Sequence, residues 1–143
     1  MKRKIYKDLL EWKNEKNKKP LMVFGARQVG KTYIINEFCL KEYKNYIYIN
    51  LFRDKTIINL YKDNKKSDDT YITFKNEYKF EENEDTIIFV DEVQESPEFI
   101  EELKYLCEVH NNLNIIVAGS LLGIKLKRCG LSFPVGKVWM IDM

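Results

Sequence analysis

The chain has 143 residues, of which 45% are hydrophobic, and this is enough for one globular domain with a buried core. Its 24 basic and 22 acidic side chains leave a formal net charge of +2, which indicates no general commitment to nucleic acid or membranes. Because the sequence shows no signal-peptide pattern and no apolar stretch of about twenty residues, we expect a cytoplasmic protein without a membrane span.

The distribution of lysines and the spacing of cysteines further limit the possible functions. Lysines crowd the first twenty residues, but a solvated helix face explains them more simply than a nucleic-acid-binding arm, so nucleic acid is permitted and not indicated. The three cysteines, Cys39, Cys107 and Cys129, lie far apart and form no Cys-x-x-Cys pair. We therefore expect reduced thiols and no zinc site.

Apolar residues recur at helical spacing near the start of the chain and predict an amphipathic helix over residues 3–15. Its buried side would contain Ile5, Leu9 and Trp12. A polar break then leads to Pro20, and the apolar run at 21–24 predicts the first strand.

A phosphate-binding loop follows that strand, since residues 25–32 read Gly-Ala-Arg-Gln-Val-Gly-Lys-Thr. Glycines let the backbone bring N–H groups against phosphates, while Lys31 would reach the β- and γ-phosphates and the Thr32 hydroxyl would bind Mg²⁺. The motif requires a helix after it, and 33–38 has a helical pattern. The residues expected to contact a nucleotide are Gly25, Ala26, Arg27, Gln28, Val29, Gly30, Lys31, Thr32 and Tyr33.

The helix after the loop should end near 41–45, and residues 46–51 predict a second strand because they are aromatic and β-branched. Residues 53–85 are charged and rich in lysine and asparagine. We expect local helices and mobile loops there, with a helix at 56–61 and a polar turn at 63–69.

Four consecutive apolar residues at 87–90 are closed by Asp91 and Glu92, a pattern typical of a strand buried on both faces. Opposite a phosphate loop this is a Walker B element, in which Asp91 would hold Mg²⁺, directly or through water. Glu92 would polarise the attacking water as a general base. A solvated strand end is the alternative for two acids, but the intact phosphate loop favours the catalytic reading.

Ser96 is placed to cap a helix that has Pro97 at its first position. Strands are predicted at 114–120 and 135–141, and strands alternating with helices indicate an α/β fold with a parallel sheet. Ser120 ends the fourth strand, where ligands gather in such sheets. It is therefore either a residue that senses the γ-phosphate or part of a Gly-Ser turn.

Two other phosphate-loop classes are disfavoured. A GTP-specific switch protein should carry Asn-Lys-x-Asp and Asp-x-x-Gly, whereas residues 64–67 read Asn-Lys-Lys-Ser and 91–94 read Asp-Glu-Val-Gln. A small-molecule kinase needs an arginine-bearing lid. Lys125, Lys127 and Arg128 are the one suggestion of a lid, and a basic turn explains them better.

The phosphate loop, Ile-Ile-Phe-Val-Asp-Glu-Val-Gln at 87–94 and Ala-Gly-Ser-Leu-Leu-Gly-Ile at 118–124 together resemble the archaeal-type ATPases of the AAA+ class. Residues 131–138 resemble that group's segment between the fourth and fifth core strands. The resemblance covers essentially the whole chain. It implies a P-loop NTPase three-layer α/β sandwich with a mostly parallel five-stranded sheet, ordered 5-1-4-3-2. It also implies ATP with Mg²⁺ as ligand and the roles given above to Lys31, Thr32, Asp91, Glu92 and Ser120.

Longer members of that class continue past the fifth strand, so we expect residues 1–143 to be one ATPase core, either a fragment or a natural truncation. The favoured function is Mg²⁺-dependent ATP hydrolysis coupled to a partner that the sequence does not identify. A nucleotide-dependent binding module with little turnover and a small-molecule kinase stay open as alternatives. A protein partner and self-association also stay open.

Overall fold

The computed structural model describes residues 2–15, 20–25, 30–63, 67–110, 112–120 and 137–140. The strands are β1 (Leu21–Gly25), β2 (Asn45–Asn50), β3 (Thr86–Asp91), β4 (Asn114–Ser120) and β5 (Lys137–Met140). The helices are α1 (Lys2–Lys13), α2 (Lys31–Glu42), α3 (Thr56–Lys62), α4 (Ser67–Glu77), the short 3-10 helix η1 (Val93–Glu95) and α5 (Pro97–Val109).

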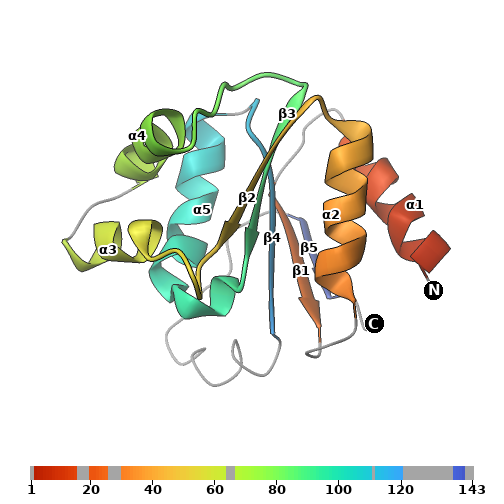
Figure 1. Ribbon diagram of the computed structural model, residues 1–143, viewed down its shortest axis with the longest axis horizontal. Helices are drawn as coiled ribbons and strands as arrows, with labels where there is room; N and C mark the ends of the chain where they lie inside the picture. The colour runs from red at the N-terminus through yellow and green to blue at the C-terminus, as the bar shows by residue number, and fades with distance from the viewer. Residues whose placement is uncertain are drawn as a thin grey trace.

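The strands form one sheet in the order β2-β3-β4-β1-β5, and every pairing is parallel (Figure 1). Read from the opposite edge, this is the predicted order 5-1-4-3-2. The register pairs Gly25 with Ser120 and Asn50 with Asp91. The carboxyl ends of four strands therefore meet along one edge of the sheet, where ligands bind in folds of this kind.

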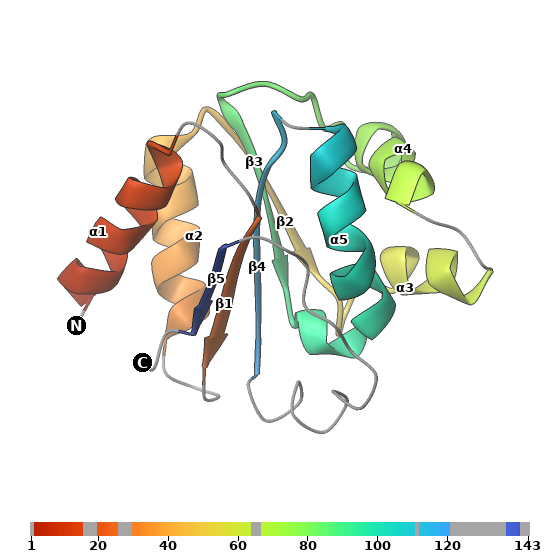
Figure 2. The ribbon, with the colours of Figure 1, turned by 180° about the vertical axis from the view of Figure 1, so that it is seen from behind.

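Helices cover both faces of the sheet, as expected of a three-layer sandwich. In Figures 1 and 2, α1 and α2 lie on one face, and α3, α4 and α5 lie on the other. Alternate residues of β3 divide between the two layers, since Ile87 and Phe89 pack with α2, whereas Ile88 and Val90 pack with α5. A strand covered on both faces must be apolar throughout, which explains the unbroken run at 87–90.

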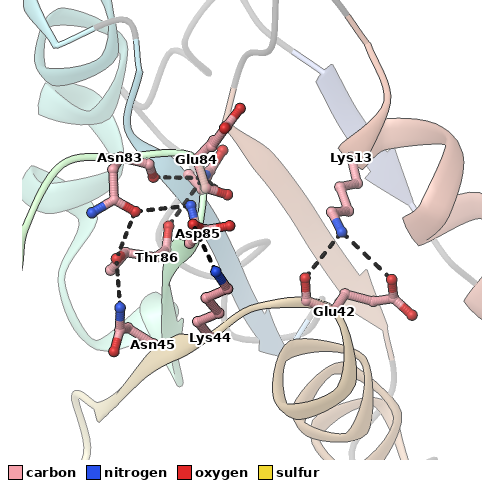
Figure 3. A network of polar contacts seen from close by, with 9 residues as sticks. Lys13, Glu42, Lys44, Asn45, Asn83, Glu84, Asp85 and Thr86 are labelled. Atoms are coloured by element: carbon pink, nitrogen blue, oxygen red, sulfur yellow. Dashed lines mark hydrogen bonds and ion pairs between the residues drawn. The ribbon is translucent and has the colours of Figure 1, made fainter.

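The N-terminal helix α1 packs against α2 through Ile5, Leu9 and Trp12, all of which are buried. It ends at Lys13, two residues earlier than predicted. The Lys13 ammonium donates to the Glu42 carbonyl at 2.9 Å and lies 3.5 Å from Glu42 Oε1 (Figure 3). The Tyr6 hydroxyl donates to Glu42 Oε2 at 2.9 Å. These contacts join α1 to the end of α2.

The segment least legible in the sequence contains two helices. The predicted helix at 56–61 is confirmed as α3, but the polar turn predicted at 63–69 is wrong in extent because α4 already begins at Ser67. Phe74, which is fully buried, anchors α4 on the core. Thr70 is also buried, but one buried apolar residue within a polar stretch is too weak a periodic signal to indicate a helix.

The helix after the acid pair begins as the sequence predicts. Ser96 caps α5, its hydroxyl accepting a hydrogen bond from the Phe99 N–H at 3.3 Å, and Pro97 is the first helical residue. The cap fixes where α5 starts and therefore where the chain after β3 turns back over the sheet.

Polar contacts fix the amino-terminal edge of β2 and β3 (Figure 3). The N–H groups of Lys44 and Asn45 donate to the Asp85 carbonyl at 2.9 and 3.0 Å. Asn83 Oδ1 accepts from the Asp85 N–H at 2.8 Å and from the Thr86 hydroxyl at 3.1 Å. Because these contacts fix the register of β2 against β3, they also determine which residues lie side by side at the carboxyl ends of the two strands.

Candidate functional site

The two ends of the predicted phosphate loop flank the carboxyl edge of β1. Gly25 ends that strand, and Gly30 adopts the left-handed conformation (φ 81°) directly before α2. A side chain at Gly30 would be strained by this backbone whatever the space around it. Four of the predicted nucleotide contacts, Ala26, Arg27, Gln28 and Val29, lie outside the described residues.

Lys31 and Thr32 occupy the first turn of α2, whose free N–H groups and dipole favour an anion. That turn contains no acidic residue. Lys31 is only 8% exposed, although it is charged. Tyr33 follows with its ring exposed at the rim of the site. The first turn of α2 therefore has the polarity that a bound phosphate chain requires.

Asp91 is the centre of the hydrogen-bond network. Its Oδ2 accepts from the Thr32 hydroxyl at 2.8 Å and from the Tyr48 hydroxyl at 2.8 Å, and its Oδ1 accepts from the Glu92 N–H at 2.9 Å. The carboxylate is 3% exposed, so these three donors replace the water that it would otherwise bind. The loop threonine and the strand-end aspartate, predicted separately as metal ligands, thus lie in contact.

The Thr32 and Asp91 oxygens fit a magnesium ion. Mg²⁺ holds oxygen ligands at about 2.1 Å in an octahedron, which places neighbouring ligands roughly 3 Å apart. The 2.8 Å between Thr32 Oγ1 and Asp91 Oδ2 is close to that spacing. Within the described residues, no group of three or more His, Cys, Asp or Glu side chains could hold a metal by itself. In nucleotide sites Mg²⁺ commonly takes its other ligands from phosphates and water.

Glu92 takes a backbone conformation unusual for a residue with a side chain (φ 55°, ψ 42°). Non-glycine residues in this left-handed region are uncommon and cluster at functional sites. Strand β3 ends at Asp91, and this turn directs Glu92 into a cavity of about 760 Å³. Side chains lining that cavity include Lys31, Thr32, Tyr33, Tyr48, Arg53 and Glu92.

Ser120 ends β4 beside Gly25 and is 6% exposed. Its N–H donates to Gln94 Oε1 at 3.1 Å, and the Gln94 amide nitrogen donates in turn to Glu92 Oε2. Ser120 is thus two hydrogen bonds away from Glu92. The basic residues Lys125, Lys127 and Arg128 and the segment 131–136 lie outside the described residues.

Sequence reasoning missed two side chains of this site. Tyr48 belongs to a predicted strand, but the sequence does not indicate which strand lies beside it. In the fold β2 pairs with β3, and the Tyr48 hydroxyl reaches Asp91 at the end of β3. Gln94 follows the acid pair by two residues, but no local rule indicates that its amide turns back to Glu92. No sequence signal marks it, because Gln94 stands among other polar residues, with Glu92 before it and Glu95 after it. Only the structure shows that its side chain is buried, at 3% exposed.

Comparison with known protein families assigns the chain to one of them. A family of AAA domains matches residues 17–143, which include the phosphate loop, the acid pair and Ser120. The chain belongs to this family. The resemblance to AAA+ ATPases is therefore confirmed, and nucleotide binding with ATPase activity is the general property of such domains.

More distant comparisons add little to that assignment. Among solved structures, C. elegans PCH-2 is similar over 99% of this chain and 44% of its own, with 12% sequence identity and a TM-score of 0.48. The chain thus spans less than half the length of that structure. No curated protein sequence matches the chain. Across the described part of the chain, none of the helices combines the length and apolarity that crossing a membrane requires.

Proposed function

We propose that this domain binds ATP with Mg²⁺ and hydrolyses the bond between the β- and γ-phosphates. The observation that carries the proposal is the 2.8 Å contact between Thr32 and Asp91 at the start of α2. Lys31 and Glu92 line the cavity beside that contact. A phosphate-binding cation, two oxygen ligands for a metal and a general base are thus within one site.

The loop and the start of α2 hold the nucleotide. The proposed nucleotide contacts are the residues from Gly25 to Tyr33. Among them, the Lys31 ammonium would offset charge on the β- and γ-phosphates, and the first N–H groups of α2 would donate to phosphate oxygens. Thr32 and Asp91 hold the metal ion. Held by these two side chains, Mg²⁺ would offset the negative charge that develops on the phosphate oxygens.

Glu92 acts on the water. Its carboxylate accepts a proton from the water whose oxygen attacks the γ-phosphorus, as the bond to the β-γ bridging oxygen breaks and ADP leaves. The residue lines the cavity directly after the end of β3. Ser120, at the end of β4, senses the γ-phosphate. Residues 1–143 act as one core that passes the nucleotide state to a protein partner or to a second copy of the chain.

The test is phosphate release from ATP with and without Mg²⁺, combined with calorimetric titration of ATP and GTP on the same sample. Glu92→Gln should lower turnover by about 10²- to 10⁴-fold, the usual contribution of a general base, and leave ATP binding intact. Lys31→Ala should abolish both. Glu101→Gln on the exposed side of α5 is the matched control and should change neither.

Two alternatives are separated by the same measurements. A binding module without turnover would bind Mg²⁺-ATP tightly and release no phosphate above background. A small-molecule kinase would transfer the phosphoryl group to an added hydroxyl compound and not to water. Either result would contradict the hydrolase proposal while leaving the nucleotide site in place.

A further inference from the structure

The side chain of Gln94 connects the two strand ends that flank the site. It is 3% exposed, and its Nε2 donates to Glu92 Oε2 while its Oε1 accepts from the Ser120 N–H at 3.1 Å. A buried side-chain amide is tolerated when both its oxygen and its nitrogen form hydrogen bonds. Here the partners are the carboxylate proposed as general base and the backbone of the residue proposed to sense the γ-phosphate.

The chemistry of the two partners fixes the orientation of this amide. A carboxylate can only accept and a backbone N–H can only donate, so the nitrogen must face Glu92 and the oxygen must face Ser120. The reversed orientation would place oxygen against oxygen and N–H against N–H. Gln94 therefore has one productive arrangement, and it holds one oxygen of Glu92 in a defined place.

Gly119 on β4 makes room for this bridge. A Cβ built at Gly119 would lie 2.6 Å from Gln94 Oε1 and 3.1 Å from Val93 Cγ1. Glycine inside a strand weakens it and commonly marks a place where another group approaches closely. The group that approaches here is the Gln94 amide. The space at Gly119 and the bridge at Gln94 are thus two parts of one arrangement.

The Glu92 side chain needs a contact of this kind, because its backbone alone does not fix the carboxylate. Its left-handed conformation and the hydrogen bond from its N–H to Asp91 Oδ1 fix the main chain, but the side chain has further rotatable bonds. A general base must stay within hydrogen-bond reach of its water. The Gln94 amide donates to the Glu92 carboxylate and so restrains it.

We propose that Gln94 is the positioning residue for Glu92 and links it to the end of β4. The proposal rests on the ATPase function proposed above. Gln94 acts through the Glu92 carboxylate, to which its amide nitrogen donates. A displacement of the β4 end at Ser120 would be transmitted through the amide to the general base, which couples the γ-phosphate end of the site to the activation of water.

The kinetic test uses Gln94→Met, which keeps the side-chain length but removes both hydrogen bonds. We expect kcat to fall about 10- to 100-fold, as misplaced catalytic groups do, with KM and the calorimetric Kd for ATP unchanged. In a Glu92→Gln background the same change should lower kcat no further. Asn76→Met on the exposed side of α4 is the matched control and should leave kcat unchanged.

A second readout does not depend on turnover. Gly119→Ala should lower the thermal unfolding midpoint because its methyl group meets Gln94 Oε1. In a Gln94→Ala background the loss should be smaller, since the side-chain oxygen is gone, with a remainder from the contacts with Val93 Cγ1 and the Gln94 backbone nitrogen. Losses that simply add would show that the Gly119 space does not serve the Gln94 amide.

The outcomes separate the two proposals. If the unaltered chain releases no phosphate, the hydrolase proposal fails and the positioning role fails with it. If the unaltered chain turns over and Gln94→Met keeps its kcat, only the positioning role fails. A Gln94→Met effect that persists in full in the Glu92→Gln background would also overturn it, because the amide would then act by another route.

Discussion

At the scale of single residues, the site depends on how many donors Asp91 receives. Its carboxylate accepts from Thr32, from Tyr48 and from the Glu92 N–H. Thr32 and Asp91 are the proposed metal ligands, whereas Tyr48 donates a hydrogen bond to the Asp91 carboxylate. Groups that hydrogen-bond to a metal-binding carboxylate orient it, and their loss typically lowers metal affinity about 10- to 100-fold.

Tyr48→Phe should weaken Mg²⁺ binding without disturbing the phosphate loop. Partial burial and the hydrogen bond to Asp91 raise the pKa of Tyr48 to about 12, so its hydroxyl stays protonated and donates throughout the neutral range. Without it, we expect the Mg²⁺ concentration for half-maximal ATP binding to rise about 10-fold. Calorimetry at a series of Mg²⁺ concentrations measures this, with exposed Tyr105→Phe as control. An equal Mg²⁺ requirement in both variants would remove Tyr48 from the site.

The sequence indicates those parts of the candidate site that depend on neighbours in the chain. Lys31, Thr32, Asp91 and Glu92 each belong to a short motif with a known purpose. Tyr48 does not, because its hydroxyl lies 43 positions from Asp91 and the contact becomes visible only when the strands are paired. Gln94 does not either: it is close to Glu92 in the chain, but its amide is also held by Ser120, 26 positions away. The chain fold, and not the local pattern, brings these side chains to the acids.

At the scale of elements, α1 is the helix whose contribution is least obvious. It precedes the segment that matches the AAA family, at residues 17–143, yet its apolar side is part of the core. Trp12 is fully buried there, beside α2. Because α2 begins with Lys31 and Thr32, a helix that holds α2 in place also supports the phosphate loop.

Trp12→Ala should destabilise the fold by about 3–5 kcal/mol, the usual cost of deleting a buried large aromatic side chain. The free energy of unfolding, measured with urea, gives the value directly. Leu40→Ala on α2 is a suitable control because Leu40 is 62% exposed and should change stability little. If Trp12→Ala costs no more than Leu40→Ala, α1 is not part of the folded core.

The elements also show where local pattern is sufficient. Ser96 and Pro97 indicated the start of α5 because capping depends on adjacent residues only. The start of α4 at Ser67 was not indicated, since its helical character depends on Phe74 reaching a distant core. Helix propensity and hydrophobic periodicity can be read from a segment alone. Where both are weak, packing against the rest of the protein determines whether the segment forms a helix.

At the scale of the whole molecule, one apolar cluster on each face of the sheet holds the strands in place. These clusters therefore also position the carboxyl ends of the strands, where the site lies. The parallel fold class followed from alternating strands and helices, but no local pattern fixes the order of strands. That order was implied by the family resemblance and agrees with the observed β2-β3-β4-β1-β5. The order matters for function because it sets β4, with Ser120, between β1 and β3.

The distribution of tyrosines predicts how the whole fold responds to alkali. Burial is the first cause that raises the pKa of a set of tyrosines, and for Tyr6, Tyr48, Tyr61 and Tyr71 the pKa reaches about 12. The pKa is also raised, again by burial first, for Tyr43, Tyr46 and Tyr78.

An unfolded chain releases these phenol protons near pH 10, whereas the folded chain keeps them to higher pH. Between those values the folded state binds more protons, so the free energy of unfolding must fall as pH rises. The stabilisation is complete below about pH 10 and is lost as pH approaches the folded-state values. Urea midpoints at about pH 9 and about pH 11 should therefore decrease in that order. The near-ultraviolet absorbance of phenolate should rise together with unfolding. Tyr61→Phe removes one partly buried phenol and should make the decrease shallower. A urea midpoint that stays constant across this interval would show that the tyrosines titrate alike in both states.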